Sequence, residues 1–317
     1  MQRAWFFFFL FLFAQCKTSP DKQVQAGADT ATGAAGNVPL VKSRRAYDYC
    51  YTNKSGIFVF NVGDKTGRHI ELKGNDIQLS PDGTRLAYTD LGDPVADRRI
   101  GLMDLETGKT TILDPACHNC YGPVWSPDGA WLAYSAFTGH EWGIKYVDTG
   151  NRHADFIARP QETRGYYSPS WTADSKRVIV HDMSAVYFID LNGHVLRTIL
   201  FKDIDTSIAA SSAMDFLLTS KEDKLIYWSS VDEQSQSGEP PSCIFSYDMS
   251  SKKVTRLTSS KYDCFKPRLK GNTIFCHGSD IKEGARGFGN VYSMDISGGD
   301  FKVAYKHCTD FSCRTKP

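Results

Sequence analysis

The chain has 317 residues, a formal net charge of +1 and an aromatic content of 13%. This length accommodates one large domain or two of ordinary size, and the near-neutral charge offers no electrostatic attraction for nucleic acid or an anionic membrane. Because Tyr, Phe and Trp are common in strands, the composition favours a globular protein rich in β-structure.

The N-terminus has the pattern of an export signal. Arg3 supplies one positive charge, and Trp5 to Ala14 form an unbroken apolar run that is too short to span a bilayer. Cys16 follows this run almost directly. Its position resembles that of the cysteine in a bacterial lipoprotein signal, which is acylated and becomes the mature N-terminus. Phe13 and Gln15 depart from that pattern, which usually has Leu three residues before the cysteine and a small residue directly before it.

Residues 1–16 are therefore expected to be a signal peptide, with Cys16 as the lipid anchor. This prediction places the protein in the bacterial cell envelope, bound to a membrane and facing either the periplasm or the cell surface. The alternative is a soluble secreted protein that is cleaved near Ala14 or at Ala26-Gly27-Ala28. Residues 17–37 are rich in Ala, Gly, Thr, Asp and Gln without periodicity, and so predict a flexible tether.

A hairpin motif recurs along the rest of the chain. Trp125-Ser126-Pro127-Asp128-Gly129, followed by Leu132-Ala133-Tyr134, predicts a strand, a tight turn and a second strand. Variants occur at Leu79 to Gly83 and at Trp171 to Ser175. Aligning these turns gives equivalent positions at Ser80, Ser126, Thr172, Ser220 and Lys270, which are spaced 46, 46, 48 and 50 residues apart.

Each hairpin is followed by a third strand that ends in Asp, a polar turn and a fourth strand. Four strands at a period of 40 to 50 residues predict a β-propeller, and coils of a β-solenoid are shorter than these units. We expect an all-β fold, a six-bladed β-propeller of four-stranded antiparallel blades, over residues 38–306. Pro39 to Val41 would form the first strand of the first unit, so that this blade would have four strands of its own.

The Ser-Pro-Asp-Gly hairpin, with Leu-Ala-Tyr after it and an Asp-x-x-Thr-Gly turn downstream, resembles the WD40-like repeat of TolB-type six-bladed propellers. The resemblance covers residues 38–306 and is most specific in the second and third units. TolB has an α/β domain before its propeller, whereas only the tether precedes these blades. The repeat also occurs in prolyl-oligopeptidase-type enzymes, but the chain lacks their Gly-x-Ser-x-Gly motif.

Propeller geometry indicates where a ligand would bind. The long, dissimilar loops between second and third strands share one face with the connections between blades, and the central channel opens among them. Candidate binding residues at this long-loop face are Asp76, Gln78, His140, Trp142, Tyr166, Lys266 and Arg268. The alternative for Lys266 and Arg268 is that they are solvated charges at a strand end.

The sequence contains no pattern that predicts a catalytic residue, a cofactor or a metal site. No paired carboxylates have acid/base spacing, and His118, His140, His277 and His307 lack the spacing of metal ligands. Asp82 and Asp128 are interpreted as turn formers and not as calcium ligands.

Eight cysteines remain besides Cys16. In an exported chain an even number suggests disulfides that hold loops together. The candidates are Cys50, Cys117, Cys120, Cys243, Cys264, Cys276, Cys308 and Cys313. Redox chemistry or half of a zinc site is the alternative for Cys117-His118-Asn119-Cys120. The tail, residues 307–317, is expected to reach back from the sixth blade to the first and to be secured there by a disulfide.

Together these observations predict a non-enzymatic binding or scaffold protein of the cell envelope. Its partner would be an envelope protein, a peptide or a glycan, with the membrane reached through the lipid anchor and with no role for nucleic acid. The alternative is an enzyme, a propeller lyase or hydrolase that acts on a polysaccharide at the channel mouth.

The anchor is tested by replacing Cys16. The Cys16→Ser protein should move from the membrane fraction to the soluble envelope fraction, because serine cannot be acylated as the thiol is. Fractionation of cells expressing either form measures this, and a Cys16→Ser protein that stays membrane-bound would refute lipidation.

Overall fold

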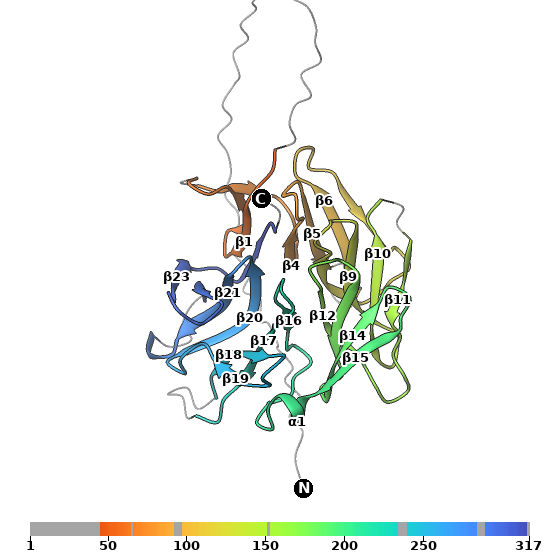
Figure 1. The fold of residues 1–317 in the computed structure, drawn as a ribbon. Coiled ribbons are helices and arrows are strands. Elements are labelled where there is room, and N and C mark those ends of the chain that lie inside the picture. Colours follow the sequence, from red (N-terminus) through yellow and green to blue (C-terminus); the bar gives the residue numbers. More distant parts are fainter. Residues whose placement is uncertain are drawn as a thin grey trace, which may run out of the picture. The chain divides into compact units, whose positions relative to one another are not determined.

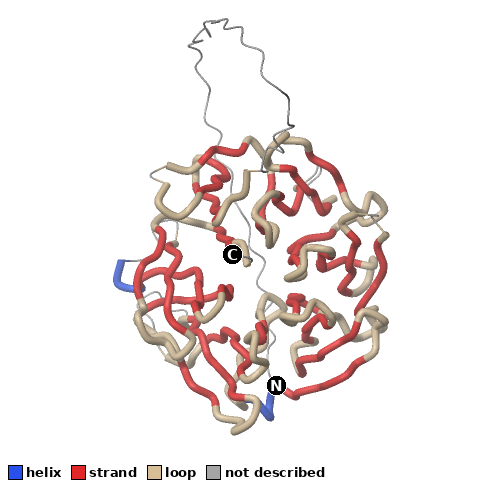
Figure 2. The backbone as a smooth tube through the Cα atoms, turned by 45° about the horizontal axis from the view of Figure 1, so that its top comes forward, coloured by secondary structure: helices blue, strands red, loops and turns tan. Residues whose placement is uncertain are grey.

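Six four-stranded antiparallel sheets follow one another around a common axis in the computed structural model (Figures 1 and 2). The structure describes residues 45–64, 66–91, 97–150, 153–233, 240–283 and 289–315. The predicted signal peptide with Cys16, the tether and the strand expected at Pro39 to Val41 lie outside these residues. The prediction of an all-β six-bladed propeller is confirmed.

Five blades are continuous in sequence. They comprise β4 (Gly74–Leu79), β5 (Arg85–Asp90), β6 (Arg99–Asp104) and β7 (Thr110–Ile112); β8 (Cys120–Trp125), β9 (Trp131–Phe137), β10 (Trp142–Asp148) and β11 (Ala154–Ala158); β12 (Tyr167–Trp171), β13 (Arg177–His181), β14 (Ala185–Asp190) and β15 (Val195–Leu200); β16 (Phe216–Leu218), β17 (Lys224–Ser230), β18 (Ser242–Asp248) and β19 (Val254–Arg256); and β20 (Tyr262–Lys270), β21 (Thr273–Asp280), β22 (Asn290–Asp295) and β23 (Lys302–Tyr305). Two short helical segments, α1 (Phe201–Ile204) and the 3₁₀ turn η1 (Ile281–Glu283), lie outside the sheets. In the described part of the chain, no helix has the length and apolarity needed to cross a membrane.

The first blade is assembled from both ends of the described chain. Its strand order is β24 (Asp310–Cys313), β1 (Tyr49–Asn53), β2 (Gly56–Phe60) and β3 (Arg68–Ile70). The expectation that this blade has four strands of its own is therefore wrong. The tail does reach back to the first blade, as predicted, and it pairs there antiparallel with β1; its securing disulfide stays a prediction.

The recurrent hairpin turn is held by its own side chains. Ser80 Oγ donates to Asp82 Oδ1 at 2.6 Å, and Ser126 Oγ donates to Asp128 Oδ1 at 2.5 Å. Gly83 has a φ of 74°, and a Cβ at this position would lie 2.2 Å from Tyr47 O. Glycine is thus required both by the turn and by the close approach of the first blade. In the fifth blade the equivalent turn opens at Thr219, one residue before the predicted Ser220.

The tryptophan of the motif links neighbouring blades. Trp125 Nε1 donates to Gln78 O at 3.1 Å, and Trp171 Nε1 donates to Val124 O at 3.1 Å. In each pair the acceptor lies on the inner strand of the preceding blade. The repeat therefore sets the spacing between blades as well as the turn within each blade.

The hydrophobic core is divided among the blade interfaces. Six clusters of buried side chains occur in the described residues, and each lies at the contact between two neighbouring blades. At the contact of the sixth blade with the first, Phe311 of β24 packs on Phe275 and Tyr305, with ring centroids 5.2 and 5.3 Å apart. The closing strand thus contributes apolar area as well as backbone hydrogen bonds.

Backbone hydrogen bonds show which turns and loops share a face of the ring. The turns between third and fourth strands bond to the hairpin turns, for example Leu105 N to Thr84 O at 3.0 Å. On the opposite face, connections between blades bond to the ends of second-to-third-strand loops, for example Tyr166 N to Trp142 O at 2.8 Å and Cys120 N to Arg98 O at 2.8 Å. We call this second face the long-loop face.

Truncation of the closing strand's aromatic side chain tests its role. Phe311 is 1% exposed, and the Phe311→Ala protein should lose about 3–5 kcal/mol of unfolding free energy. Urea denaturation followed by tryptophan fluorescence measures this. Val303→Ala, at a position that is 42% exposed on β23, is the control and should change stability by no more than about 0.5 kcal/mol. A loss below about 1 kcal/mol for Phe311→Ala would contradict a structural role for β24.

Candidate functional site at the centre of the long-loop face

Inner strands of the blades carry a recurrent backbone irregularity near their beginnings. The register shifts within β4, β8, β12 and β20, next to residues with positive φ: Asp76 (49°), Gly122 (66°), Ser168 (46°) and Lys266 (47°). Each stands four residues before the residue that opens the hairpin turn, as does Asp215 in the fifth blade, and Asp310 begins the inner strand of the first blade. A β-bulge redirects a side chain, and its recurrence makes it a property of the fold. The residue type at this position is what differs between blades.

Charged side chains from these positions form one cluster, which we call the axial cluster. It consists of Asp76, Asp215, Lys266, Arg268, His277 and Asp310. Lys266 Nζ lies 3.9 Å from Asp76 Oδ1, Arg268 Nη1 lies 3.7 Å from Asp215 Oδ1, and His277 Nε2 lies 4.0 Å from Asp310 Oδ1. All three separations exceed hydrogen-bond length, so these pairs attract one another without a direct hydrogen bond.

Other hydrogen bonds fix the carboxylates. Asp76 Oδ2 accepts from Thr89 Oγ1 at 2.9 Å, and Asp215 Oδ2 accepts from Trp228 Nε1 at 3.3 Å. Asp310 Oδ2 accepts from the backbone N–H of Ile77 at 2.8 Å, which joins the closing strand to the second blade. The positions of the three acids are therefore set by elements of the fold.

Burial governs the ionisation of the inner members of the cluster. Desolvation raises the pKa of Asp215 and of Asp310 above the ordinary value, and the charges of Lys266 and Arg268 partly oppose this shift. Desolvation, followed by repulsion from Lys266 and Arg268, lowers the pKa of His277 to about 3. At neutral pH His277 is therefore uncharged, and its contact with Asp310 is not an ion pair.

The cluster has an outer and an inner part. The side chains of Asp76 and Lys266 are 27% and 40% exposed, whereas that of His277 is 7% exposed. The cluster contains three carboxyl groups and two cationic side chains, and Asp76 is the acid on its exposed side. The arrangement can therefore accept a cationic group at its exposed part, next to Asp76.

Four of the seven predicted binding residues lie together. Asp76, Lys266 and Arg268 belong to the axial cluster. Gln78 follows Asp76 by two residues on β4, and its Oε1 accepts from Ser312 Oγ on β24 at 3.4 Å. Whether they bind a ligand stays a prediction.

The other three predicted residues lie elsewhere. Tyr166 is 7% exposed and packs on Tyr187 in the core between the third and fourth blades. His140 is exposed in a loop. Trp142 joins an aromatic group with Tyr121, and the guanidinium of Arg98 lies 5.8 Å from the Trp142 ring centroid and 4.5 Å from that of Tyr121. None of these three residues belongs to the axial cluster.

Asp215, His277 and Asp310 were not predicted as site residues. Asp215 could have been found from its position four residues before the turn at Thr219, and His277 from its pairing beside β20. Asp310 could be assigned only after β24 was recognised as the inner strand of the first blade. In the described residues, no group of three or more His, Cys, Asp or Glu side chains has the geometry to hold a metal ion.

The cysteines divide into one bonded pair and six thiols. Cys117 and Cys120 form a disulfide on the connection that leads into the third blade. Cys50, Cys243, Cys264, Cys276, Cys308 and Cys313 are buried free thiols in this structure. All but Cys308 lie within strands and not in loops. For these six, disulfide bonding stays a prediction.

Comparison with known proteins supports the fold. No protein-family model and no curated protein matches the chain. TolB from Acinetobacter baumannii is similar in structure, with a TM-score of 0.60 and 17% identity, over 84% of this chain and 66% of that one. A candidate TolB from Agrobacterium tumefaciens has a TM-score of 0.56 and 17% identity, over 82% of this chain and 88% of that one. An oligogalacturonate lyase in complex with manganese has a TM-score of 0.52 and 17% identity, over 80% of this chain and 71% of that one. The chain is thus a six-bladed propeller similar in fold to TolB propellers.

The buried histidine makes a pH-dependent contribution to stability. The folded pKa of His277 lies below its unfolded value of about 6.5, so the unfolded state binds the proton first as pH falls. Protonation of His277 therefore lowers the free energy of unfolding between about pH 6.5 and 3. The raised pKa values of Asp215 and Asp310 act in the opposite direction. In His277→Gln the loss of unfolding free energy between pH 7 and pH 4 should therefore be smaller than in the wild type, by on the order of 2 kcal/mol.

Urea denaturation at each pH measures this difference. His194→Gln replaces an exposed histidine on the opposite face and should keep the wild-type pH dependence. An unchanged pH dependence in His277→Gln would contradict the burial of a neutral imidazole.

Proposed function

We propose that this chain is a non-enzymatic binding protein of the bacterial cell envelope, anchored by a lipid on Cys16. Its long-loop face would hold a partner protein or peptide, with the axial cluster as the point of charge recognition. The observation that supports this most directly is the cluster itself, in which two ion pairs at 3.7 and 3.9 Å are not closed by direct hydrogen bonds. A group from a partner can bridge such charges without first breaking a hydrogen bond between them.

The position of Asp76 favours a cationic group. Asp76 is the acid on the exposed side of the cluster, and a Lys or Arg side chain of a partner would form a charge-assisted hydrogen bond with it. The rigid ring and the hydrogen bonds to Asp76 and Asp310 hold these acids in place before binding, which reduces the entropy lost on association. This arrangement supports recognition of a basic segment.

Neutralising Asp76 tests the proposal. The Asp76→Asn protein should retain the partner from detergent-solubilised envelope about tenfold less well than the wild type, and wild-type capture should weaken as salt is raised. Glu106→Gln is a matched control, because it removes one negative charge from the same blade at the opposite face. Quantitative mass spectrometry of the captured proteins measures both.

Two results would contradict the proposal. One is the capture of the same proteins, in equal amount, by wild type and Asp76→Asn. The other is the release of oligosaccharides from a polysaccharide incubated with the purified protein, which would instead establish the alternative lyase or hydrolase.

A further inference from the structure

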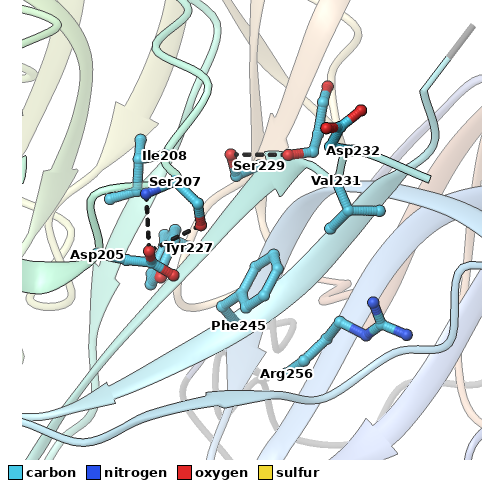
Figure 3. A pocket seen from close by; sticks show the side chains of 10 residues that line it. Asp205, Ser207, Ile208, Tyr227, Ser229, Val231, Asp232, Phe245 and Arg256 are labelled. Atoms are coloured by element: carbon cyan, nitrogen blue, oxygen red, sulfur yellow. Dashed lines mark hydrogen bonds between the residues drawn. The ribbon is translucent and has the colours of Figure 1, made fainter.

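A hollow lies on the long-loop face at the fifth blade, and its lining residues do not include those of the axial cluster (Figure 3). Its volume is about 260 Å³. It lies between the segment after α1, which contains Asp205, and the ends of β17 and β18. The volume is below the range of pockets for drug-sized ligands and far above the roughly 30 Å³ of a water molecule, so it suits a single small ring.

The hollow has a buried hydroxyl without a hydrogen-bond partner. Tyr227 lines it and is 1% exposed, and its Oη has no partner among the described residues. Burial, followed by the nearby charge of Asp205, raises the pKa of Tyr227, so the phenol stays protonated and can donate. An unpaired buried hydroxyl is unfavourable. The Oη of Tyr227 has less than 1 Å² of accessible surface, so a ligand oxygen supplies the missing acceptor once the side chains that cover Oη shift.

Aromatic rings form one wall. The ring of Phe245 stacks on that of Tyr227, with centroids 5.4 Å apart and an interplanar angle of 17°, and Tyr227 stacks in turn on Phe216. Phe245 is only partly buried. This wall offers a flat apolar surface to one face of a ligand ring.

The remaining wall is polar and acidic. Asp205 Oδ1 accepts from Ser207 N and Oγ at 2.8 and 2.7 Å, which fixes its carboxylate, and Asp232 lies across the hollow. Arg256 also lines the hollow, but it is paired with Glu233 at 2.5 Å. Because Arg256 is already paired, the carboxylates of Asp205 and Asp232 have no cation to balance them in the lining, and an anionic ligand is disfavoured.

We propose that this hollow binds one neutral or amino sugar in its pyranose form, either free or at the end of a glycan. Such a ring has an apolar C–H face for Phe245, hydroxyl donors for Asp205 and Asp232, and hydroxyl oxygens that can accept from Tyr227. A uronic acid is excluded by the acidic wall. This site is separate from the axial cluster, and it goes beyond the proposed function.

Titration of the purified protein with glucose, galactose, N-acetylglucosamine, glucosamine and galacturonic acid tests the proposal, by saturation-transfer NMR and calorimetry. At least one neutral or amino sugar should bind, and galacturonic acid should bind at least tenfold more weakly than galactose. Tyr227→Phe should weaken binding about tenfold and Phe245→Ala about fivefold. Tyr247→Phe, on the same strand as Phe245 but outside the hollow, should bind as the wild type does.

A thermal measurement gives a second readout. Because Tyr227→Phe removes an unpaired buried hydroxyl, the variant without sugar should melt at or above the wild-type temperature, while the upward shift caused by sugar should be lost. Asp76→Asn should leave sugar binding unchanged, so this proposal and the proposed function can fail independently. The inference is overturned if none of the neutral or amino sugars binds, if galacturonic acid binds as tightly as galactose, or if Tyr227→Phe binds as the wild type does.

Discussion

Pairing of β24 with β1 is the interaction on which the rest of the molecule depends. It completes the first blade, and it brings Phe311 into the apolar contact with the sixth blade. The same strand sends Asp310 and Ser312 to backbone N–H groups of β4, at Ile77 and Leu79. One four-residue strand thus joins the sixth, first and second blades, and it supplies an acid to the axial cluster.

The two faces of the ring differ in how regular their side chains are. On one face, repeated Ser/Thr-to-Asp hydrogen bonds hold near-identical turns, and tryptophans fix the distance between blades. On the other, a bulge that recurs in four blades places a different residue at the same position of each, namely Asp76, Gly122, Ser168 and Lys266. Because the backbone there is nearly constant, the chemistry of the long-loop face is set by residue type alone. This explains how acids, bases and an unpaired phenol occur on one regular scaffold.

Local signals explain which parts of the fold were predictable. The conformation of a Ser-Pro-Asp-Gly turn depends on residues close in sequence, so the turns at Ser80 and Ser126 were predicted at the correct positions. The closing strand has no such turn and pairs with residues more than 250 positions away, and so its role could not be read from its sequence. Asp76 and Lys266 were found because they lie near recognisable turns, whereas Asp310 depends on that distant pairing. The six buried thiols were expected in loops because cysteine number reports on compartment and not on position.

The location of Asp310 also has a consequence for the order of events during folding. Its hydrogen bond to Ile77 spans 233 residues, so the axial cluster can form only after nearly the whole chain has been made. Closure over such a separation is slow, because the entropy of the loop must be lost before the contact is gained. Until then β1 exposes an unpaired edge that another chain can extend, which makes domain exchange and aggregation the characteristic failures of an unclosed ring. The axial cluster is therefore completed last, together with the pairing that covers the edge of β1.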